Sequence, residues 1–164
     1  MHVTRAVDYG LRALILMSRQ PVGARFFLQE LATQADLPRN YLVKVLKSLA
    51  CGGIVRSHRG IKGGFSLARE PREVSMRHVV EAIDGPVAVM HCLTDPRSCS
   101  HAGKCAAEVY FSELRQTILG QMEGRSLQDL IELQEKIDRQ AACPCQAGAA
   151  TSGPARAKGS SRNP

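Results

Sequence analysis

The stretch PRNYLVKVLKSLACGGIVRSHRGIKGGFSLA, residues 38–68, predicts a helix followed by a β-hairpin. Pro38 suits a first helical turn, because its missing N–H would have no partner there anyway. Apolar side chains then recur at helical spacing and form one buried stripe: Leu42, Val45, Leu46 and Leu49. Gly52 and Gly53 end the helix, and Cys51 just before them is expected to lie in the core.

The second half of this stretch predicts two short strands, residues 54–55 and 65–67, joined by a tight turn. The turn is rich in glycine and positive charge, and it contains His58, Arg59, Gly60 and Lys62. A glycine backbone is slim enough to approach the wall of a DNA groove, so these four residues are candidate DNA contacts.

Upstream, residues 4–19 and 27–35 show helical periodicity, with Thr4 as a candidate cap of the first helix. Residues 36–38 interrupt the second helix before the helix of residues 38–50 begins. Two helices joined by a tight turn and followed by a hairpin predict a winged helix-turn-helix. The third helix then enters the major groove of DNA, with its N-terminal side chains near the base edges.

Side chains suited to reading DNA gather at that N-terminal end: Arg39, Asn40 and Tyr41, followed by Lys44 and Lys47. Asparagine pairs bidentately with adenine and arginine with guanine, whereas lysine more often binds phosphate. Charge agrees with this reading, because residues 1–80 hold 13 Lys and Arg against 5 Asp and Glu, a balance of +8. Residues 81–145 hold 6 against 10, a balance of −4. A basic first half indicates a nucleic-acid face.

Downstream, a helix is expected from Ser75 to residue 84, a long helix from residue 106, and a last helix from Ser126, where Asp129 three residues on gives an arrangement close to a capping box. The fold class is therefore mainly α with a small β-hairpin: a winged helix-turn-helix domain plus a long helix. We divide the chain into a DNA-binding domain (1–84), a cysteine loop (85–105), two helices (106–141) and a disordered basic tail (142–164).

The loop HCLTDPRSCSHAGKC, residues 91–105, contains Cys92, Cys99 and Cys105. Structural zinc sites usually pair their ligands at the spacing C-x2-4-C. The three cysteines here are separated by six and five residues, and this wider spacing instead favours a larger inorganic group such as an iron–sulfur cluster. Zinc bound by these cysteines and a histidine stays an alternative. A fourth ligand is required, and the candidates are Asp8, His91, Asp95 and His101. The role of Cys143 and Cys145 stays open.

No apolar run approaches the roughly 20 residues that span a bilayer, and the N-terminus lacks the pattern of a secretory signal. We therefore expect a cytoplasmic protein with no membrane partner, in which thiols stay reduced. No catalytic triad, P-loop or dinucleotide fingerprint occurs, so an enzyme is not expected. A protein–protein module that uses the winged domain without DNA is a further alternative.

The whole pattern resembles the IscR/NsrR family of bacterial winged-helix iron–sulfur transcription regulators. The resemblance covers about residues 1–140 and is carried by TRAVDYGLRAL (4–14), residues 31–68, VVEAIDGPVAVMHCL (79–93) and the cysteine loop. It implies a homodimer, with the helix from residue 106 to about 121 crossing its copy, and repression at partly palindromic double-stranded promoter DNA. No small-molecule substrate is implied.

The resemblance also implies that Cys92, Cys99 and Cys105 hold the cluster. In the nitric-oxide-responsive branch, the fourth ligand is an aspartate on the first helix of the other subunit, and Asp8 stands at the matching place. The gap between the first two cysteines is six residues rather than the commoner five, which leaves the branch open. We favour a 4Fe–4S over a 2Fe–2S cluster, and we expect DNA affinity to respond to nitric oxide, iron or cluster supply, or redox state. The alternative is a DNA-binding regulator with a structural zinc or a direct thiol switch.

Overall fold

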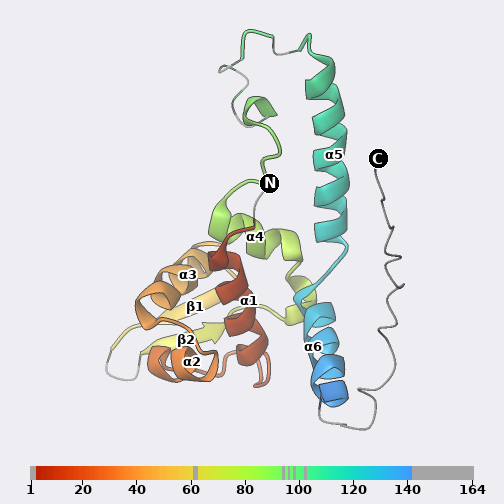
Figure 1. Cartoon of the computed structure of the whole chain (residues 1–164). Helices are drawn as coiled ribbons and strands as arrows, with labels where there is room; N and C mark the ends of the chain where they lie inside the picture. The colour runs from red at the N-terminus through yellow and green to blue at the C-terminus, as the bar shows by residue number, and fades with distance from the viewer. Residues whose placement is uncertain are drawn as a thin grey trace, which may run out of the picture.

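The computed structural model describes residues 3–60, 63–93, 95, 97, 99–101 and 103–141. The cysteines at positions 143 and 145 and the basic tail lie outside these ranges, as does Lys62. Figure 1 shows the elements in chain order: α1 (Arg5–Met17), α2 (Leu28–Gln34), α3 (Arg39–Cys51), β1 (Val55–His58), β2 (Gly64–Leu67), η1 (Pro71–Glu73), α4 (Met76–Asp84), η2 (His91–Leu93), α5 (Ala106–Glu123) and α6 (Leu127–Ala141).

The two strands form an antiparallel hairpin in which Val55 pairs with Leu67 and His58 with Gly64. Phe26, in the connection between α1 and α2, adds a bridge to Phe65. The hairpin of β1 and β2 follows α3 directly and forms the wing (Figure 1). The expected fold class, mainly α with a small β-hairpin, is confirmed.

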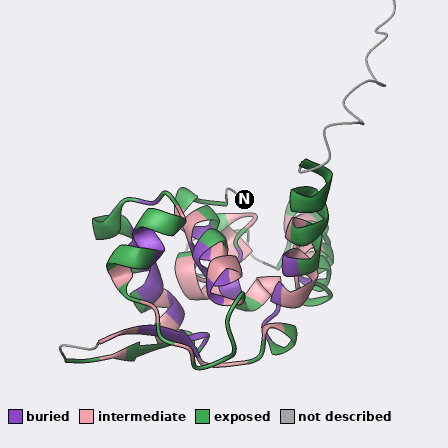
Figure 2. Cartoon of the chain, turned by 90° about the horizontal axis from the view of Figure 1, so that it is seen from below, coloured by how far each residue is buried: buried purple, intermediate pink, exposed green. Residues whose placement is uncertain are grey.

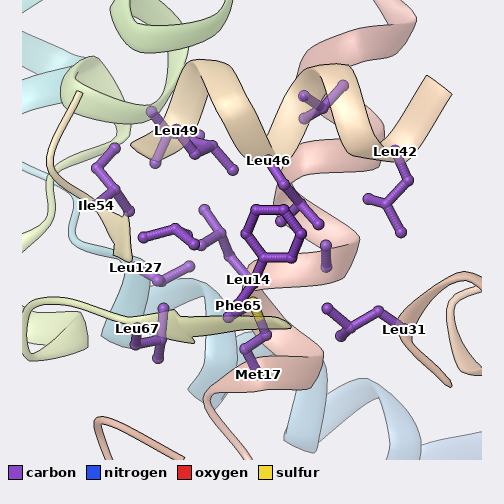
Figure 3. Close-up of a cluster of buried hydrophobic side chains, with 14 of the residues drawn as sticks. Leu14, Met17, Leu31, Leu42, Leu46, Leu49, Ile54, Phe65, Leu67 and Leu127 are labelled. Carbon is purple, nitrogen blue, oxygen red and sulfur yellow. The ribbon is translucent and has the colours of Figure 1, made fainter. Parts of the chain in front are cut away.

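One hydrophobic core joins the first three helices to the hairpin. Figure 3 shows Leu14 and Met17 of α1, Leu46 of α3 and Phe65 of β2 pointing toward one another. The apolar stripe expected on α3 is buried in full: Leu42, Val45, Leu46 and Leu49. Burial of such a stripe is what fixes the rotation of α3, so its polar side chains must face outward.

Cys51 is exposed, so the expectation that it lies in the core is wrong. Successive residues of a helix are about 100° apart, so residue 51 lies about 200° around the axis from Leu49. That rotation places Cys51 on the side opposite the buried stripe. Sequence proximity to an apolar stripe is thus a poor guide to burial at a helix end.

Helix α4 packs against α1 and α3 and carries the chain out of the winged domain. At its start, Ser75 Oγ accepts a hydrogen bond from His78 N over 3.3 Å, which caps the helix. At its end, Asp84 Oδ1 accepts from Thr4 Oγ1 over 2.7 Å. Thr4 is the N-cap residue of α1 but makes no side-chain cap there, because its hydroxyl bonds to Asp84 instead. Its expected position as the N-cap residue is confirmed, whereas a capping hydrogen bond from its side chain is absent.

Helix α5 stands apart from the winged domain in Figure 1, with its C-terminal end near α4 and its N-terminal end near the cysteine loop. Helix α6 follows α5 and lies beside α1 and η1. The expected capping box is present: Asp129 N donates to Ser126 Oγ over 3.2 Å, and Ser126 N donates to Asp129 Oδ2 over 2.7 Å. Within the described ranges, no helix is both long and apolar enough to cross a membrane.

Candidate DNA interface and cysteine loop

The turn between α2 and α3 sets the angle at which α3 is presented. Asp36 adopts a left-handed conformation with φ of 52°. Around it, Leu37 N donates to Ala32 O over 2.9 Å and Asp36 N donates to Thr33 O over 3.3 Å. This pair of bonds is a Schellman motif, and Leu37 and Ala32, at the positions of its usual apolar contact, are both buried. The helix-turn-helix therefore has a sharp, hydrogen-bonded corner.

The exposed face of α3 carries the side chains that we predict to read DNA. All five are exposed: Arg39, Asn40, Tyr41, Lys44 and Lys47. The first three occupy the first helical turn, directly after the N-cap Pro38. The helix dipole adds positive potential at that end, which favours an approach to phosphate. The structure thus presents these residues on one helix, with three of them at the end that reaches base edges in helix-turn-helix proteins.

The wing places Arg59 and Gly60 at its exposed tip, whereas the His58 ring lies within the hairpin. His58 Nε2 is 2.9 Å from Ser66 Oγ, a buried hydroxyl on the opposite strand. Gly60 has φ of 97°, a conformation that favours glycine. Lys62, the remaining predicted wing contact, is outside the described ranges. The view in Figure 2 shows the hairpin reaching beyond the body of the domain, with exposed and half-buried residues toward its tip.

The three cysteines of the loop lie at different points along its path. Cys92 is in η2, Cys99 is in the irregular segment, and Cys105 is the N-cap residue of α5. Each is a free, half-buried thiol. In the part of the chain that the structure describes, no three His, Cys, Asp or Glu side chains approach closely enough to hold a metal ion. The structure therefore does not bring the predicted ligands together.

The donor set nevertheless fits an iron–sulfur group in its chemistry, because thiolates are the usual ligands of iron in such clusters. The loop also has backbone contacts that give it a local shape: Asp95 N donates to His91 O over 3.0 Å, and Arg97 N donates to Asp95 Oδ1 over 3.2 Å. A groove of about 300 Å³ lies beside Cys105, between the loop and α5, and Glu108 and Glu113 also line it. His101, four residues before Cys105, is exposed.

Asp8 lies on the exposed side of α1 and is paired with Arg12 one turn later. Arg12 Nε donates to Asp8 Oδ1 over 3.1 Å, and Arg12 Nη2 lies 3.1 Å from Asp8 Oδ2. Both side chains are about half exposed. The carboxylate is thus oriented outward, where a second copy of the chain could approach it.

An apolar face is exposed along α5. Val109 and Tyr110 are 61% and 62% exposed, and Leu114, one turn further, is 37% exposed. These positions repeat at helical spacing on a helix whose main contacts in the described part of the chain are with α4 and η2. Large apolar side chains gathered on one surface indicate an interaction site.

Sequence reasoning missed two contacts that shape these sites. The ring of Tyr9 meets the ring of Tyr41, and Arg115 Nε donates to the Val87 backbone oxygen over 2.8 Å. Neither leaves a signal in the sequence, because each joins elements whose relative placement depends on tertiary packing. The Asp8–Arg12 pair could have been found, since Asp and Arg four residues apart share a helix face.

Comparisons with known proteins agree with the regulator-like architecture. Residues 3–133 match the family described as Rrf2, iron-dependent transcriptional regulator. An rrf2-like HTH-type transcriptional regulator of Rhodobacter capsulatus is 30% identical over 137 residues, which cover 79% of this chain and 91% of that relative.

Two solved structures share the fold. CymR (YrzC), described as the global cysteine regulator of B. subtilis, matches with a TM-score of 0.62 at 21% identity, over 81% of this chain and 98% of CymR. IscR of T. potens matches with a TM-score of 0.61 at 21% identity, over 84% of this chain and 90% of IscR. At these identities the two likenesses concern the fold alone.

Proposed function

Because this chain belongs to the Rrf2 family of transcriptional regulators, we propose that it is a dimeric repressor whose promoter affinity depends on an iron–sulfur cluster. The family consists of DNA-binding transcription regulators and not of enzymes. One observation carries the proposal: α4 leads directly from the DNA-reading unit into a loop with three free thiols, which leads directly into α5. The cysteine loop therefore lies, along the chain, between the DNA-reading unit and the exposed helix α5.

DNA recognition is assigned to α3 and the wing. Arg39, Asn40 and Tyr41 contact base edges, and Lys44 and Lys47 contact phosphates. Arg59 and Gly60 of the wing, with Lys62 and His58, approach the neighbouring groove or backbone. The support is the outward orientation of the α3 side chains, opposite a fully buried apolar stripe.

The cysteine loop is assigned to the cluster. Cys92, Cys99 and Cys105 are its thiolate ligands, and Asp8 of the other subunit is the fourth, with His91 and His101 as alternatives. The family description as iron-dependent supports iron at this site. The cluster, 4Fe–4S in preference to 2Fe–2S, supplies a centre that nitric oxide, oxidants or shortage of iron can alter. Closing the loop on it requires the three thiols to converge from their separate positions.

Dimerisation is assigned to α5. A second copy of α5 would cover Val109, Tyr110 and Leu114 and remove their large exposed apolar surface from water. The dimer then determines the separation of the two α3 helices, and half-sites about one turn of DNA apart demand a matching separation. The ordering of the cysteine loop is thereby coupled to the distance between the two α3 helices of the dimer. A change of about 1.4 kcal/mol in the coupling free energy alters DNA affinity tenfold.

Iron and acid-labile sulfide analysis of protein purified without oxygen tests this proposal. We expect comparable amounts of iron and sulfide, a brown colour, and loss of both in Cys99→Ala. Cys51→Ala is the matched control, because Cys51 is an exposed thiol outside the loop. Normal iron and sulfide in Cys99→Ala would refute the ligand assignment.

The same preparation decides the alternative of a structural zinc or a direct thiol switch. Within that alternative, the separation of the three thiols in the described part of the chain favours only the direct thiol switch, because a zinc ion would also need them to converge. A colourless protein with zinc, or with no metal, would support this alternative over a cluster.

For the fourth ligand, Asp8→Ala is expected to change the visible spectrum or the decay rate of the cluster without preventing dimerisation. Unchanged values would shift the assignment to His91 or His101.

A further inference from the structure

Tyr41, at the N-terminal end of α3, has its ring held by an aromatic side chain of another helix. The ring of Tyr9, on α1, meets it edge to face, with centroids 5.4 Å apart and ring planes at 85°. Tyr41 is 42% exposed, whereas Tyr9 is half-buried and packs against the hydrophobic core. One tyrosine of the pair is therefore anchored, and the other is presented to solvent.

This contact restricts the torsions of the Tyr41 side chain. Edge-to-face packing is favourable only over a limited range of ring orientations, so it selects among the rotamers open to an exposed tyrosine. A side chain ordered before binding loses less conformational entropy when it binds. The phenolic hydroxyl, which both donates and accepts hydrogen bonds, is then held at a defined place at the N-terminal end of α3.

The residue after Tyr9 fixes the two helices against each other. Gly10 is buried, and a Cβ atom built there would lie 3.3 Å from Val45 Cγ1 of α3 and 2.5 Å from Ile83 Cδ1 of α4. Helix α1 therefore lies close to the middle of α3, one turn beyond Tyr41. Because α1 and α3 pack closely at Gly10, the backbone of Tyr9 is fixed relative to α3, and its ring keeps its contact with the Tyr41 ring.

We propose that Tyr9 is a positioning residue for sequence recognition, which acts by holding the Tyr41 hydroxyl where it meets one fixed group of the operator DNA. This inference rests on the proposed function, in which the N-terminal end of α3 reads DNA. Tyr9 works through Tyr41 and not through a DNA contact of its own. Its loss should therefore reduce discrimination between sequences rather than general DNA binding.

The test compares full-length Tyr9→Leu, Tyr41→Leu, the double variant and the conservative variants Tyr9→Phe and Tyr41→Phe. The specific probe is a duplex of about 30 base pairs, long enough for two half-sites, enriched by the wild-type protein from a random-sequence library. The reference probe is a shuffled duplex of the same composition. Thermal unfolding of each variant is recorded in parallel as a check of folding.

Tyr9→Leu is expected to weaken binding to the enriched duplex about three- to tenfold, with unchanged affinity for the shuffled duplex. The double variant should bind no more weakly than Tyr41→Leu alone, because Tyr9 acts through Tyr41. Tyr9→Phe should match the wild type, since it keeps the ring. Tyr41→Phe keeps the ring contact and loses only the hydroxyl, so it should lose specific affinity without a change in folding.

Multiplicative effects of the two leucine substitutions would overturn the inference, as would wild-type affinity of Tyr9→Leu beside a weakened Tyr41→Leu. Both results leave the proposed function standing. Wild-type specific affinity of Tyr41→Phe would overturn the role of the hydroxyl even if Tyr9→Leu fails to fold. A wild type that does not distinguish the enriched from the shuffled duplex would contradict the proposed function itself.

Discussion

Arg115 and Val87, 28 residues apart, are joined by a hydrogen bond of 2.8 Å from the arginine Nε to the valine backbone oxygen. Val87 is buried near the start of the cysteine loop, and Arg115 lies in the middle of α5. The bond therefore ties the entrance of the loop to the helix that follows its exit. It gives the loop a closed path, with both ends held by the same helix.

Arg115→Met removes this donor and keeps much of the apolar stem. We expect a loss of about 1 kcal/mol in unfolding free energy, because the carbonyl of Val87 loses its partner. We also expect faster loss of iron, since the loop entrance is released. Thermal unfolding and the decay of visible absorption in air measure the two effects. Gln116→Met, at an exposed neighbouring position, is the control, and decay at the same rate in both variants would contradict this role of Arg115.

Asp36→Gly should stabilise the protein by about 0.5–1 kcal/mol, because glycine adopts the left-handed conformation of residue 36 without a steric penalty. Asp36→Val should destabilise it by at least about 1 kcal/mol, since a β-branched residue is poorly tolerated there. Urea denaturation of both variants measures the difference. A valine variant as stable as the glycine variant would show that the turn does not need this conformation.

Gly52→Ala should destabilise the contact between α3 and α4. A Cβ at residue 52 would lie 2.7 Å from Ala82 Cβ, which is attached to backbone and cannot turn aside. Overpacking of this kind costs about 1–3 kcal/mol. Adding Ala82→Gly should restore part of the loss, although it weakens α4 by about 1 kcal/mol on its own. If the two substitutions are simply additive in denaturation experiments, the close approach is not the cause.

Much of the winged domain could be predicted from the sequence, because its signals are local. The apolar stripe of α3 and the glycines of the hairpin gave element bounds within a few residues of those observed, and the family resemblance is confirmed. Cys51 was misjudged because its side of the helix depends on rotation and not on proximity to the stripe. The contact of Tyr9 with Tyr41 could not be foreseen, since it depends on how two helices pack. The predicted ligands and DNA contacts stay predictions.

Stability at low pH should depend on Asp129. Hydrogen bonds from the Ser126 backbone N–H and hydroxyl, together with the charge of Arg125, hold the pKa of this carboxyl below its ordinary value. The charged form is therefore favoured by folding, and the stabilisation is present at neutral pH, above the unfolded pKa of about 3.9. It declines as the pH falls below that value, through the lower pKa of the folded protein.

Asp129→Asn should consequently be less stable than the wild type at pH 7, with a gap that narrows toward pH 3. Urea denaturation across this range measures the gap. Glu135→Gln removes a charge from an exposed position of the same helix and serves as the control. A gap that stays constant or widens on acidification would show that the carboxylate of Asp129 does not stabilise the start of α6.

The most direct test of cluster-dependent regulation is the DNA affinity of one oxygen-free preparation before and after removal of its iron by a chelator. Both forms are titrated at the same salt concentration against the enriched duplex, because phosphate contacts make affinity salt-dependent. The account predicts a difference of at least about tenfold between the two forms, with both still dimeric. Equal affinities, in a preparation shown to have held iron and sulfide, would contradict it.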